Sequence, residues 1–251
     1  MQNPRIAILT LCVGADYTRA MEPGLASKRA YAAKHGYALH IGGAEVWDRT
    51  RPAPWSKLNF IQKYLDSYDY LFWSDADVII MNQDLRLEDH VLPLLPASKD
   101  MIWCIDACGN INNGNMLLRG KSAWLADFLK RAYGQTDLVN HIWWDNAGML
   151  RLYETHATDK AMIETSAEHW KFNAYLFKDN LCKTAAQSRL YETGDFLVHF
   201  AGVYDPWNIY RFMNYLLTSG DTIDESLLES WRKQPPKNKA EADETLKNLC
   251  L

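Results

Sequence analysis

Long apolar runs are missing from this 251-residue chain, and no stretch reaches the roughly 20 residues of a transmembrane helix. Basic charge is not in excess either, since 27 Lys and Arg stand against 31 Asp and Glu, for a net charge of −4. The sequence also has no internal repeats and no low-complexity tracts. These absences exclude a multi-span membrane protein and a disordered or fibrous chain. They also mean that nucleic acid is not the default partner.

Cysteine is scarce and widely spaced, with five residues at positions 12, 104, 108, 182 and 250. An odd number at these spacings is no disulfide framework, and no second pair joins Cys104 and Cys108 to complete a zinc knuckle. Reduced, mostly buried thiols suit a cytosolic protein. The apolar residues 6–13 follow a single basic side chain and precede no small-residue cleavage site, which favours a buried strand over a signal peptide. We therefore expect a cytoplasmic protein without a transmembrane segment.

The composition, with 48% hydrophobic and 23% charged residues, is that of a folded globular chain large enough for one domain. Residues 5–13 and 37–41 have strand patterns, and residues 19–35 between them have helical spacing that Gly36 ends. Such a βαβ unit builds a parallel sheet. Further helices are expected at 55–65, 87–95, 122–133, 142–153 and 208–218, and further strands at 68–73, 78–81, 101–105, 116–118 and 196–198. We predict an α/β fold over residues 1–219, with helices around a mostly parallel central sheet. A C-terminal surface helix and tail are expected over residues 220–251.

The sharpest motif is Asp75-Ala76-Asp77, which follows the apolar strand predicted at 68–73. Ligands of doubly wound sheets bind at the carboxyl ends of strands. Two neighbouring carboxylates repel each other unless a cation compensates them. Their oxygens suit Mg²⁺ or Mn²⁺, which also bind substrate phosphates. The motif therefore predicts a metal-bound phosphate or diphosphate, and a solvated acidic turn is the alternative.

His199 ends the strand predicted at 196–198, and Gly202 follows three residues later. A histidine there could complete a metal site with Asp75 and Asp77, while Gly202 would let the backbone approach a phosphate. A lone histidine of this kind is otherwise more often buried and bonded to a carbonyl group.

Two polar motifs could face a sugar. Asp145 and Asn146 lie at or near the start of a predicted helix, where an aspartate can also serve only as a cap. The run Asn112-Asn-Gly114-Asn115 usually forms a turn, although Asn112 could bind a sugar hydroxyl.

In this order, the motifs resemble nucleotide-sugar glycosyltransferases of the GT-A (Rossmann-like) fold. The resemblance is above all to glycosyltransferase family 34, the fungal α-galactosyl- and α-mannosyltransferases and plant xyloglucan xylosyltransferases. It extends more distantly to the glycogenin-type family 8. The likeness covers roughly residues 4–207. It is carried by residues 5–10, Lys34-His-Gly-Tyr37, Trp55-Ser-Lys57, Asp75-Ala-Asp77, Asn112-Asn-Gly114, Asp145-Asn146 and His199-Phe-Ala-Gly202.

The resemblance implies roles for these positions. Asp75, Asp77 and His199 would bind Mn²⁺ or Mg²⁺, and Asp145 and Asn146 would act at the reacting face of the sugar. The nucleobase pocket would consist of Thr10, Leu11, Cys12 and Val13. Further donor contacts would come from Lys57, Asp75, Ala76, Asn112, Gly114, Asp145 and Gly202.

Two positions depart from the family pattern. Asp205 stands where the glycogenin-type motif has a lysine that contacts the diphosphate, so another cation must serve. Lys57, Lys28 and Arg211 are the candidates. Asn146 stands where these families usually have glutamine, which shortens the reach of the amide by one methylene.

The activity implied is transfer of a hexose or pentose from a nucleotide diphosphate donor to a hydroxyl of a glycan or glycolipid. A UDP-sugar is the favoured donor and a GDP-sugar the alternative. The related families retain the anomeric configuration and make α-linkages. Because Asn146 is a poor nucleophile, we favour same-face attack, with the leaving phosphate accepting the proton and Asp145 supporting an oxocarbenium-like sugar.

Four aromatic residues beside the motifs, Trp143, Trp144, Tyr204 and Trp207, are candidates for an acceptor groove, with bulky core as the alternative. Two other functions remain open. One is a sugar-nucleotide or glycan-binding module without turnover. The other is a phosphatase of the haloacid-dehalogenase type, which also has Asp-x-Asp after an apolar strand.

Overall fold

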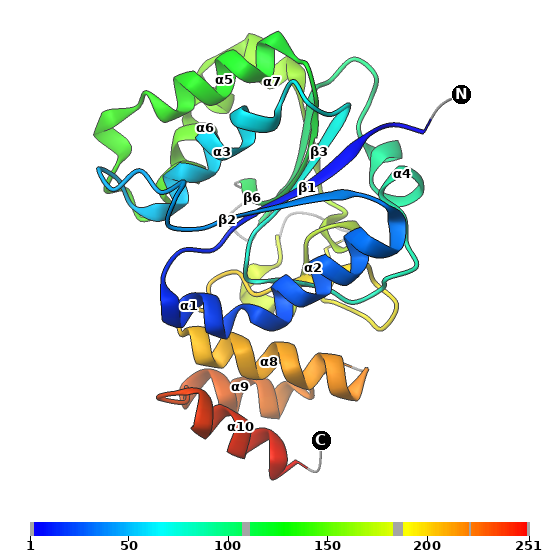
Figure 1. Ribbon diagram of the computed structural model, residues 1–251, viewed down its shortest axis with the longest axis vertical. Helices are drawn as coiled ribbons and strands as arrows, with labels where there is room; N and C mark the ends of the chain where they lie inside the picture. Colours follow the sequence, from blue (N-terminus) through cyan, green and yellow to red (C-terminus); the bar gives the residue numbers. More distant parts are fainter. Residues whose placement is uncertain (1–2, 107–110, 183–187, 221, 250–251) are drawn as a thin grey trace.

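A six-stranded sheet forms the centre of the computed structural model, which describes residues 3–106, 111–182, 188–220 and 222–249 (Figure 1). The strand order is β2-β1-β3-β6-β5-β7. Five strands run in one direction, and only β6 runs against its neighbours β3 and β5. The predicted mostly parallel α/β sheet is thus confirmed. The strands are β1 (Ile6–Leu11), β2 (Ala38–Gly42), β3 (Tyr70–Ser74), β5 (Met101–Ile105), β6 (Ile111–Arg119) and β7 (Ile163–Ser166).

A smaller sheet has the order β4-β9-β8. Its strands are β4 (Val78–Ile80), β8 (Ala174–Tyr175) and β9 (Leu197–His199). Because β4 starts only four residues after β3 ends, residues 75–77 pass directly from one sheet to the other. The helices are α1 (Ala15–Ala20), α2 (Glu22–His35), α3 (Ser56–Tyr64), α4 (Leu87–His90), α5 (Ala123–Tyr133), α6 (Trp144–Thr155), α7 (Ala157–Met162), α8 (Pro206–Ser219), α9 (Glu225–Lys233) and α10 (Lys239–Lys247). Single 3-10 turns occur at Ala53–Trp55, Leu92–Leu94, Thr136–Leu138, His169–Lys171 and Lys178–Asn180.

The side chains of β1 point alternately to the two faces of the main sheet, which explains why both faces are covered. Ala7 and Leu9 join a core cluster with residues of α3, α5 and α6, whereas Ile6 and Ile8 join a cluster on the other face with α2 and α4. Successive side chains of a strand point to opposite faces, so a strand that is apolar throughout needs cover on both. Figure 1 shows α3, α5, α6 and α7 on one side of the sheet and α2 on the other.

Two local expectations were wrong. The helix predicted over 19–35 is divided into α1 and α2, with Pro23 in the first turn of the second helix, where a missing N–H costs least. Residues 112–115 form no turn but lie within β6, where Asn115 pairs with Ser74 and Asn112 with Cys104. Strands on both sides supply backbone partners there, which outweighs the turn preference of asparagine and glycine.

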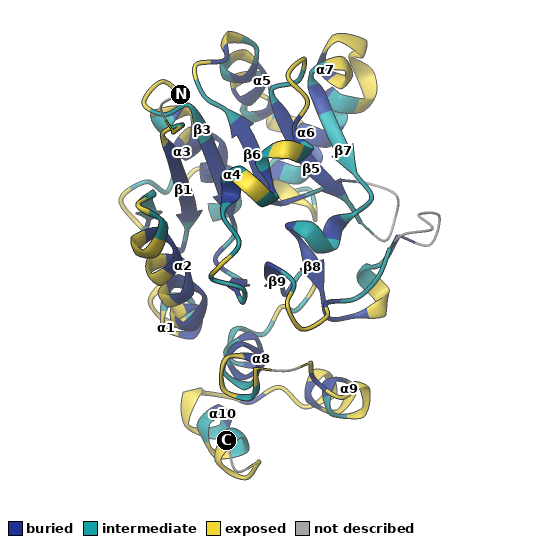
Figure 2. Ribbon diagram, turned by 90° about the vertical axis from the view of Figure 1, so that its right-hand side faces the viewer, coloured by how far each residue is buried: buried dark blue, intermediate teal, exposed yellow. Residues whose placement is uncertain are grey.

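The C-terminal segment forms two helices, where a surface helix and a tail were expected. In Figure 2, α9 and α10 lie beside α8. Leu228, Trp231 and Ala242 are buried, and the first two join a core cluster with residues of α8. A division of the chain at residue 219 stays a prediction.

Within the described ranges, every helix is too short or too polar to span a bilayer. Cys12, Cys104 and Cys182 are buried, as expected, and Cys108 and Cys250 lie outside the described residues.

Candidate functional site

Three segments that are distant in sequence meet at one edge of the main sheet. Strand β3 ends there at Ser74, and β6, which runs in the opposite direction, has its first residues there. The N–H of Asp75 donates to the carbonyl of Gly114 at 2.8 Å. In the small sheet, Val78 pairs with His199, and the N–H of Phe200 donates to the carbonyl of Asp77 at 3.0 Å. Backbone pairing thus brings the two predicted motifs, residues 75–77 and His199, together.

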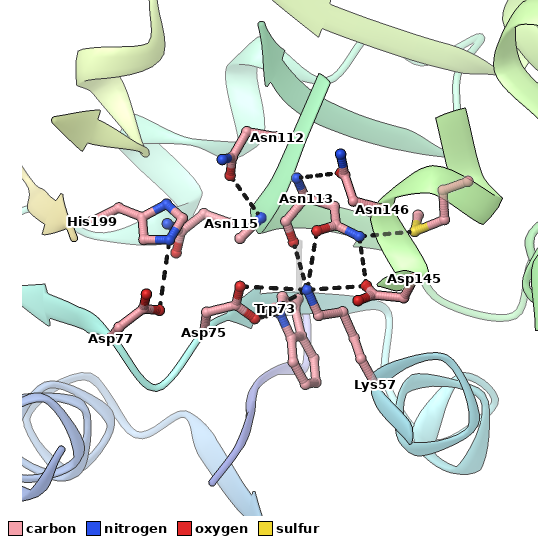
Figure 3. A network of polar contacts seen from close by, with 12 residues as sticks. Lys57, Trp73, Asp75, Asp77, Asn112, Asn113, Asn115, Asp145, Asn146 and His199 are labelled. Carbon is pink, nitrogen blue, oxygen red and sulfur yellow. Dashed lines mark hydrogen bonds and ion pairs between the residues drawn. The ribbon is translucent and has the colours of Figure 1, made fainter. Parts of the chain in front are cut away.

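Asp75, Asp77 and His199 converge as predicted (Figure 3). One ligand atom from each lies within 4.8 Å of the others, and Nε2 of His199 is 3.6 Å from Oδ1 of Asp77. Burial acts to raise the pKa of Asp77, but His199 and Lys28 bring it below its ordinary value. Two carboxylates and an imidazole form a donor set that suits a divalent cation such as Mn²⁺.

Lys57 is buried between two carboxylates, on the side of Asp75 that faces away from His199 (Figure 3). Its Nζ lies 3.1 Å from Oδ1 of Asp75 and 3.3 Å from Oδ2 of Asp145. It also donates to Oδ1 of Asn113 at 3.1 Å. Burial acts to lower the pKa of Lys57, but Asp145 and Asp75 raise it above its ordinary value. The ammonium group therefore stays charged and neutralises part of the carboxylate cluster.

Asp145 does not cap its helix, although it lies in the first turn of α6. The N-cap is Trp143, whose side chain makes no capping bond. Asp145 is only 3% exposed, and its carboxylate accepts from Nδ2 of Asn113 at 2.7 Å. Burial raises the pKa of Asp145, and the attraction of Lys57 does not fully offset this. The next residue, Asn146, binds the β6 backbone through both ends of its amide, at Asn113 N (3.2 Å) and Ile111 O (3.0 Å).

A cavity of about 480 Å³ contains this edge of the sheet. Most of the predicted site residues line it, namely Leu11, Val13, Lys57, Asp75, Ala76, Asp77, Asn112, Gly114, Asp145, Asn146, His199 and Gly202. Thr10 and Cys12 are buried and are not among the lining residues.

The mouth of the cavity is apolar. Its lining includes Ile142, Trp143, Trp144 and Tyr204, which are 78%, 40%, 40% and 88% exposed. Trp144 has a φ of 44°, in the left-handed region that bulky residues avoid. Trp207, the fourth aromatic candidate, instead packs against the cluster around α8.

Asp205 has a structural role that explains its departure from the family pattern. Its carboxylate caps α8 by accepting from the N–H of Asn208 at 2.8 Å. Of the three cations named as substitutes for a lysine there, only Lys57 lines the cavity. Lys28 is buried and donates to the carbonyl of Val78 at 2.5 Å, and the guanidinium of Arg211 lies over the ring of Trp231. Among the described lining residues, four aspartates therefore face one lysine: Asp75, Asp77, Asp106 and Asp145 against Lys57.

Three buried asparagines belong to the site but were not predicted as site residues. Asn113 joins Lys57 to Asp145, while Asn115 and Asn173 lie behind His199. Asn113 and Asn115 are in the same asparagine-rich run as Asn112, which was a usable signal. Asn173 lies in a polar stretch without periodicity, and nothing in the sequence distinguishes it.

Comparison with known proteins gives a consistent assignment of the fold. The model of a family described as galactosyl transferase GMA12/MNN10 matches residues 2–95. A Schizosaccharomyces pombe protein named as an uncharacterized alpha-1,2-galactosyltransferase is 37% identical over 73 residues, which is 26% of this chain and 19% of that protein. An alpha-1,2-galactosyltransferase of the same organism is 24% identical over 221 residues, or 70% of this chain and 54% of that protein. The chain thus spans about half or less of the length of these curated relatives.

Among solved structures, a glycosyltransferase involved in glycosylation of the major capsid of PBCV-1 superposes with a TM-score of 0.60 at 14% identity. That superposition covers 84% of this chain and all of the other. The chain has the GT-A glycosyltransferase fold and, over residues 2–95, resembles the galactosyl transferase family GMA12/MNN10.

Proposed function

We propose that this protein is a metal-dependent glycosyltransferase that moves a sugar from a nucleotide diphosphate to a hydroxyl group. The observation that carries the proposal is the convergence of Asp75, Asp77 and His199 in the wall of a large cavity, at the edge of the sheet where α/β proteins bind ligands. Resemblance to galactosyltransferases over the segment that includes Asp75 and Asp77 supports it.

A divalent cation fits the charges of this site. Lys57 compensates Asp75 and Asp145, but its single ammonium group is shared between these two carboxylates, while Asp77 is stabilised by His199 and Lys28. A diphosphate would add further negative charge. Mn²⁺ or Mg²⁺ bound by Asp75, Asp77 and His199 would supply positive charge opposite the developing negative charge of the leaving diphosphate.

Leu11 and Val13 would contact the nucleobase, and Asn112 and Asp145 would bind hydroxyls of the donor sugar. A UDP-sugar is the favoured donor and a GDP-sugar the alternative. The names of the relatives describe α-linkages, which supports a retaining reaction from an α-linked donor. The carboxylate of Asp145 is held by Lys57 and Asn113, which favours electrostatic support of the sugar over nucleophilic attack. We therefore keep same-face attack as the mechanism, with the leaving phosphate accepting the proton of the acceptor.

The acceptor would enter through the apolar mouth of the cavity. Trp143, Trp144 and Tyr204 present exposed rings there, and the apolar face of a sugar ring stacks well on such surfaces. This arrangement favours a glycan or glycolipid acceptor over a small polar alcohol.

Thermal unfolding with UDP or GDP, with and without Mn²⁺, tests the donor site first. A nucleotide that binds only the folded state at 100 times its Kd stabilises it by about 2.7 kcal/mol. We expect one nucleotide to raise the Tm only when Mn²⁺ is present. Asp77→Ala should abolish that shift, whereas Asp127→Ala, which removes an exposed carboxylate on α5, should keep it.

Turnover is then measured with matching nucleotide sugars, by release of nucleotide and sugar. If neither nucleotide raised the Tm of folded protein in the presence of Mn²⁺, the proposal would be contradicted. Binding without sugar release would favour the non-catalytic module. Hydrolysis of simple phosphate esters, lost in Asp75→Asn, would favour the phosphatase.

A further inference from the structure

Asn173 is fully buried, lies immediately before β8 and lines no part of the cavity, yet it contacts the predicted metal ligand His199. Its Oδ1 accepts from Asn115 Nδ2 at 2.7 Å and lies 2.8 Å from His199 Nδ1. Its Nδ2 donates to Asn112 Oδ1 at 3.2 Å and to the hydroxyl of Tyr175 at 2.8 Å. Both donors and both acceptor positions of this amide are therefore in use.

The orientation of the two amides follows from a backbone group that cannot rotate. The N–H of Gly114 donates to the side chain of Asn112 at 2.9 Å, so the atom of Asn112 facing it must be the oxygen. The same oxygen faces Asn173, which must therefore present its NH₂ group there. The opposite end of Asn173, facing His199, is consequently the carbonyl oxygen.

This arrangement determines which nitrogen of His199 carries the proton. Nδ1 lies 2.8 Å from a carbonyl oxygen and must donate to it. In a neutral imidazole the other nitrogen, Nε2, then has a lone pair and no hydrogen. Nε2 is also the atom that faces Asp77, at 3.6 Å. A histidine can coordinate a cation only through an unprotonated nitrogen.

We propose that Asn173 is a positioning residue that holds His199 in the Nδ1–H tautomer and so presents Nε2 to a divalent cation with Asp75 and Asp77. The inference rests on the metal-binding part of the proposed function. It adds Asn173, a residue that no pattern in the sequence indicated. It also explains why a fully buried asparagine occupies this place, since both ends of its amide are needed.

The first test is the tautomer itself, read from long-range ¹H–¹⁵N couplings of the imidazole in metal-free protein near pH 8, where imidazoles are ordinarily neutral. His199 should show the Nδ1–H form, and the assignment comes from the missing signal in His199→Gln. An Nε2–H form in the wild-type protein would overturn the proposal. This readout needs neither metal nor sugar transfer, so its failure is distinguishable from failure of the proposed function.

The second test measures Mn²⁺ affinity without nucleotide, by electron paramagnetic resonance of free Mn²⁺. Asn173→Leu keeps the size of the side chain but removes the acceptor, and we expect affinity to fall about 10- to 100-fold. Asn173→Asp keeps an oxygen opposite Nδ1 but loses the NH₂ group that donates to Asn112 and Tyr175, so affinity should fall less than in Asn173→Leu, because a carboxylate also accepts from histidine in carboxylate–histidine–metal triads. Rescue by aspartate separates the hydrogen bond from the mere filling of space.

Asn208→Leu is the matched control, because Asn208 is another buried asparagine, bonded to the carbonyl of Trp231 on α9. It should leave Mn²⁺ affinity unchanged even if it lowers the Tm. The proposal would be overturned if folded Asn173→Leu bound Mn²⁺ as tightly as the wild type. It would also be overturned if Asn173→Asp and Asn173→Leu, both folded, lost Mn²⁺ affinity to the same extent. If Asn173→Leu does not fold, Asn173→Asp and the tautomer of the wild-type protein decide the question.

Discussion

Gly114→Ala should disrupt the proposed metal site without replacing any of its ligands. A Cβ at residue 114 would lie 2.2 Å from Cε1 of His199 and 2.8 Å from its Nδ1. Carbon atoms in contact are normally about 3.5–4.0 Å apart, so the ring or strand β6 must move by more than about 1 Å. Neither moves easily, because Gly114 O accepts from Asp75 N and the His199 ring is bonded to Asn173.

The magnitude follows from the tolerance of metal coordination. Ligand distances in a working site vary by only about 0.2 Å, so a displacement of about 1 Å removes His199 from the coordination sphere. We expect Mn²⁺ affinity to fall at least about 10-fold, in line with the loss of a group that supports a ligand. The added methyl should also lower the free energy of unfolding by about 1–3 kcal/mol, the usual cost of overpacking.

The assay is a Mn²⁺ titration together with urea unfolding of the metal-free protein. Gly134→Ala is the control, since a Cβ there comes no closer than 3.4 Å to its neighbours and lies at the end of α5. It should change neither quantity appreciably. Gly114→Ala protein that binds Mn²⁺ as tightly as wild type would refute the reasoning, because the ring would then have moved without cost to the site.

Four further outcomes are expected. Asp145→Asn should lower kcat for sugar transfer about 10²- to 10³-fold with Mn²⁺ affinity unchanged, and a normal kcat would exclude Asp145 from the chemistry. Lys57→Met leaves buried carboxylates without their cation and should lower the free energy of unfolding in urea by about 3–5 kcal/mol. Adding Asp145→Asn to Lys57→Met removes one of these carboxylates and should restore part of that free energy. Burial lowers the pKa of Lys28 to about 7 in the folded protein. Above that pH, Lys28 therefore carries its proton in the unfolded chain but has lost it in the folded one. Stability should therefore rise between about pH 7 and 9, by at most ~1.4 kcal/mol per pH unit, and Lys28→Met should flatten that slope in unfolding curves. Trp144→Gly relieves a left-handed φ, so the Tm should stay unchanged. It also removes a ring proposed to contact the acceptor, so the KM for the acceptor should rise up to about tenfold while the rate of donor hydrolysis stays constant.

The convergence of the three candidate metal ligands could be predicted from the sequence because each follows or ends an apolar strand. Asp75 and Asp77 follow β3, and His199 ends β9. Strand ends of an α/β sheet meet at a shared edge, so proximity was a reasonable inference from local pattern alone. The predicted strand and helix positions were mostly right for the same reason, since apolar periodicity is a local property.

The asparagine run was predicted to form a turn because the strands that pair with it are distant in sequence. Residues 112–115 have turn composition, and only pairing with β3 and β5 makes them a strand. The direction of β6 was equally hidden. It runs against its neighbours, so the beginning of β6, and not its end, lies at the ligand edge. Asn173 could not be found at all, since its importance comes from contacts with residues 26 to 61 positions away.

The run of asparagines has a physical reason in the charge of the site. Neighbouring residues of β6 contact both parts of the site. Asn113 binds Lys57 and Asp145. Asn112 binds Asn173, which in turn is hydrogen-bonded to His199. Charged side chains in these places would have to be buried beside a carboxylate cluster whose charge Lys57 and Lys28 only partly offset. Amides make the same number of directed hydrogen bonds without adding charge. The strand can therefore fix the geometry of both the proposed metal ligands and Asp145 without adding charge, so that the excess negative charge is available to the divalent cation that we propose.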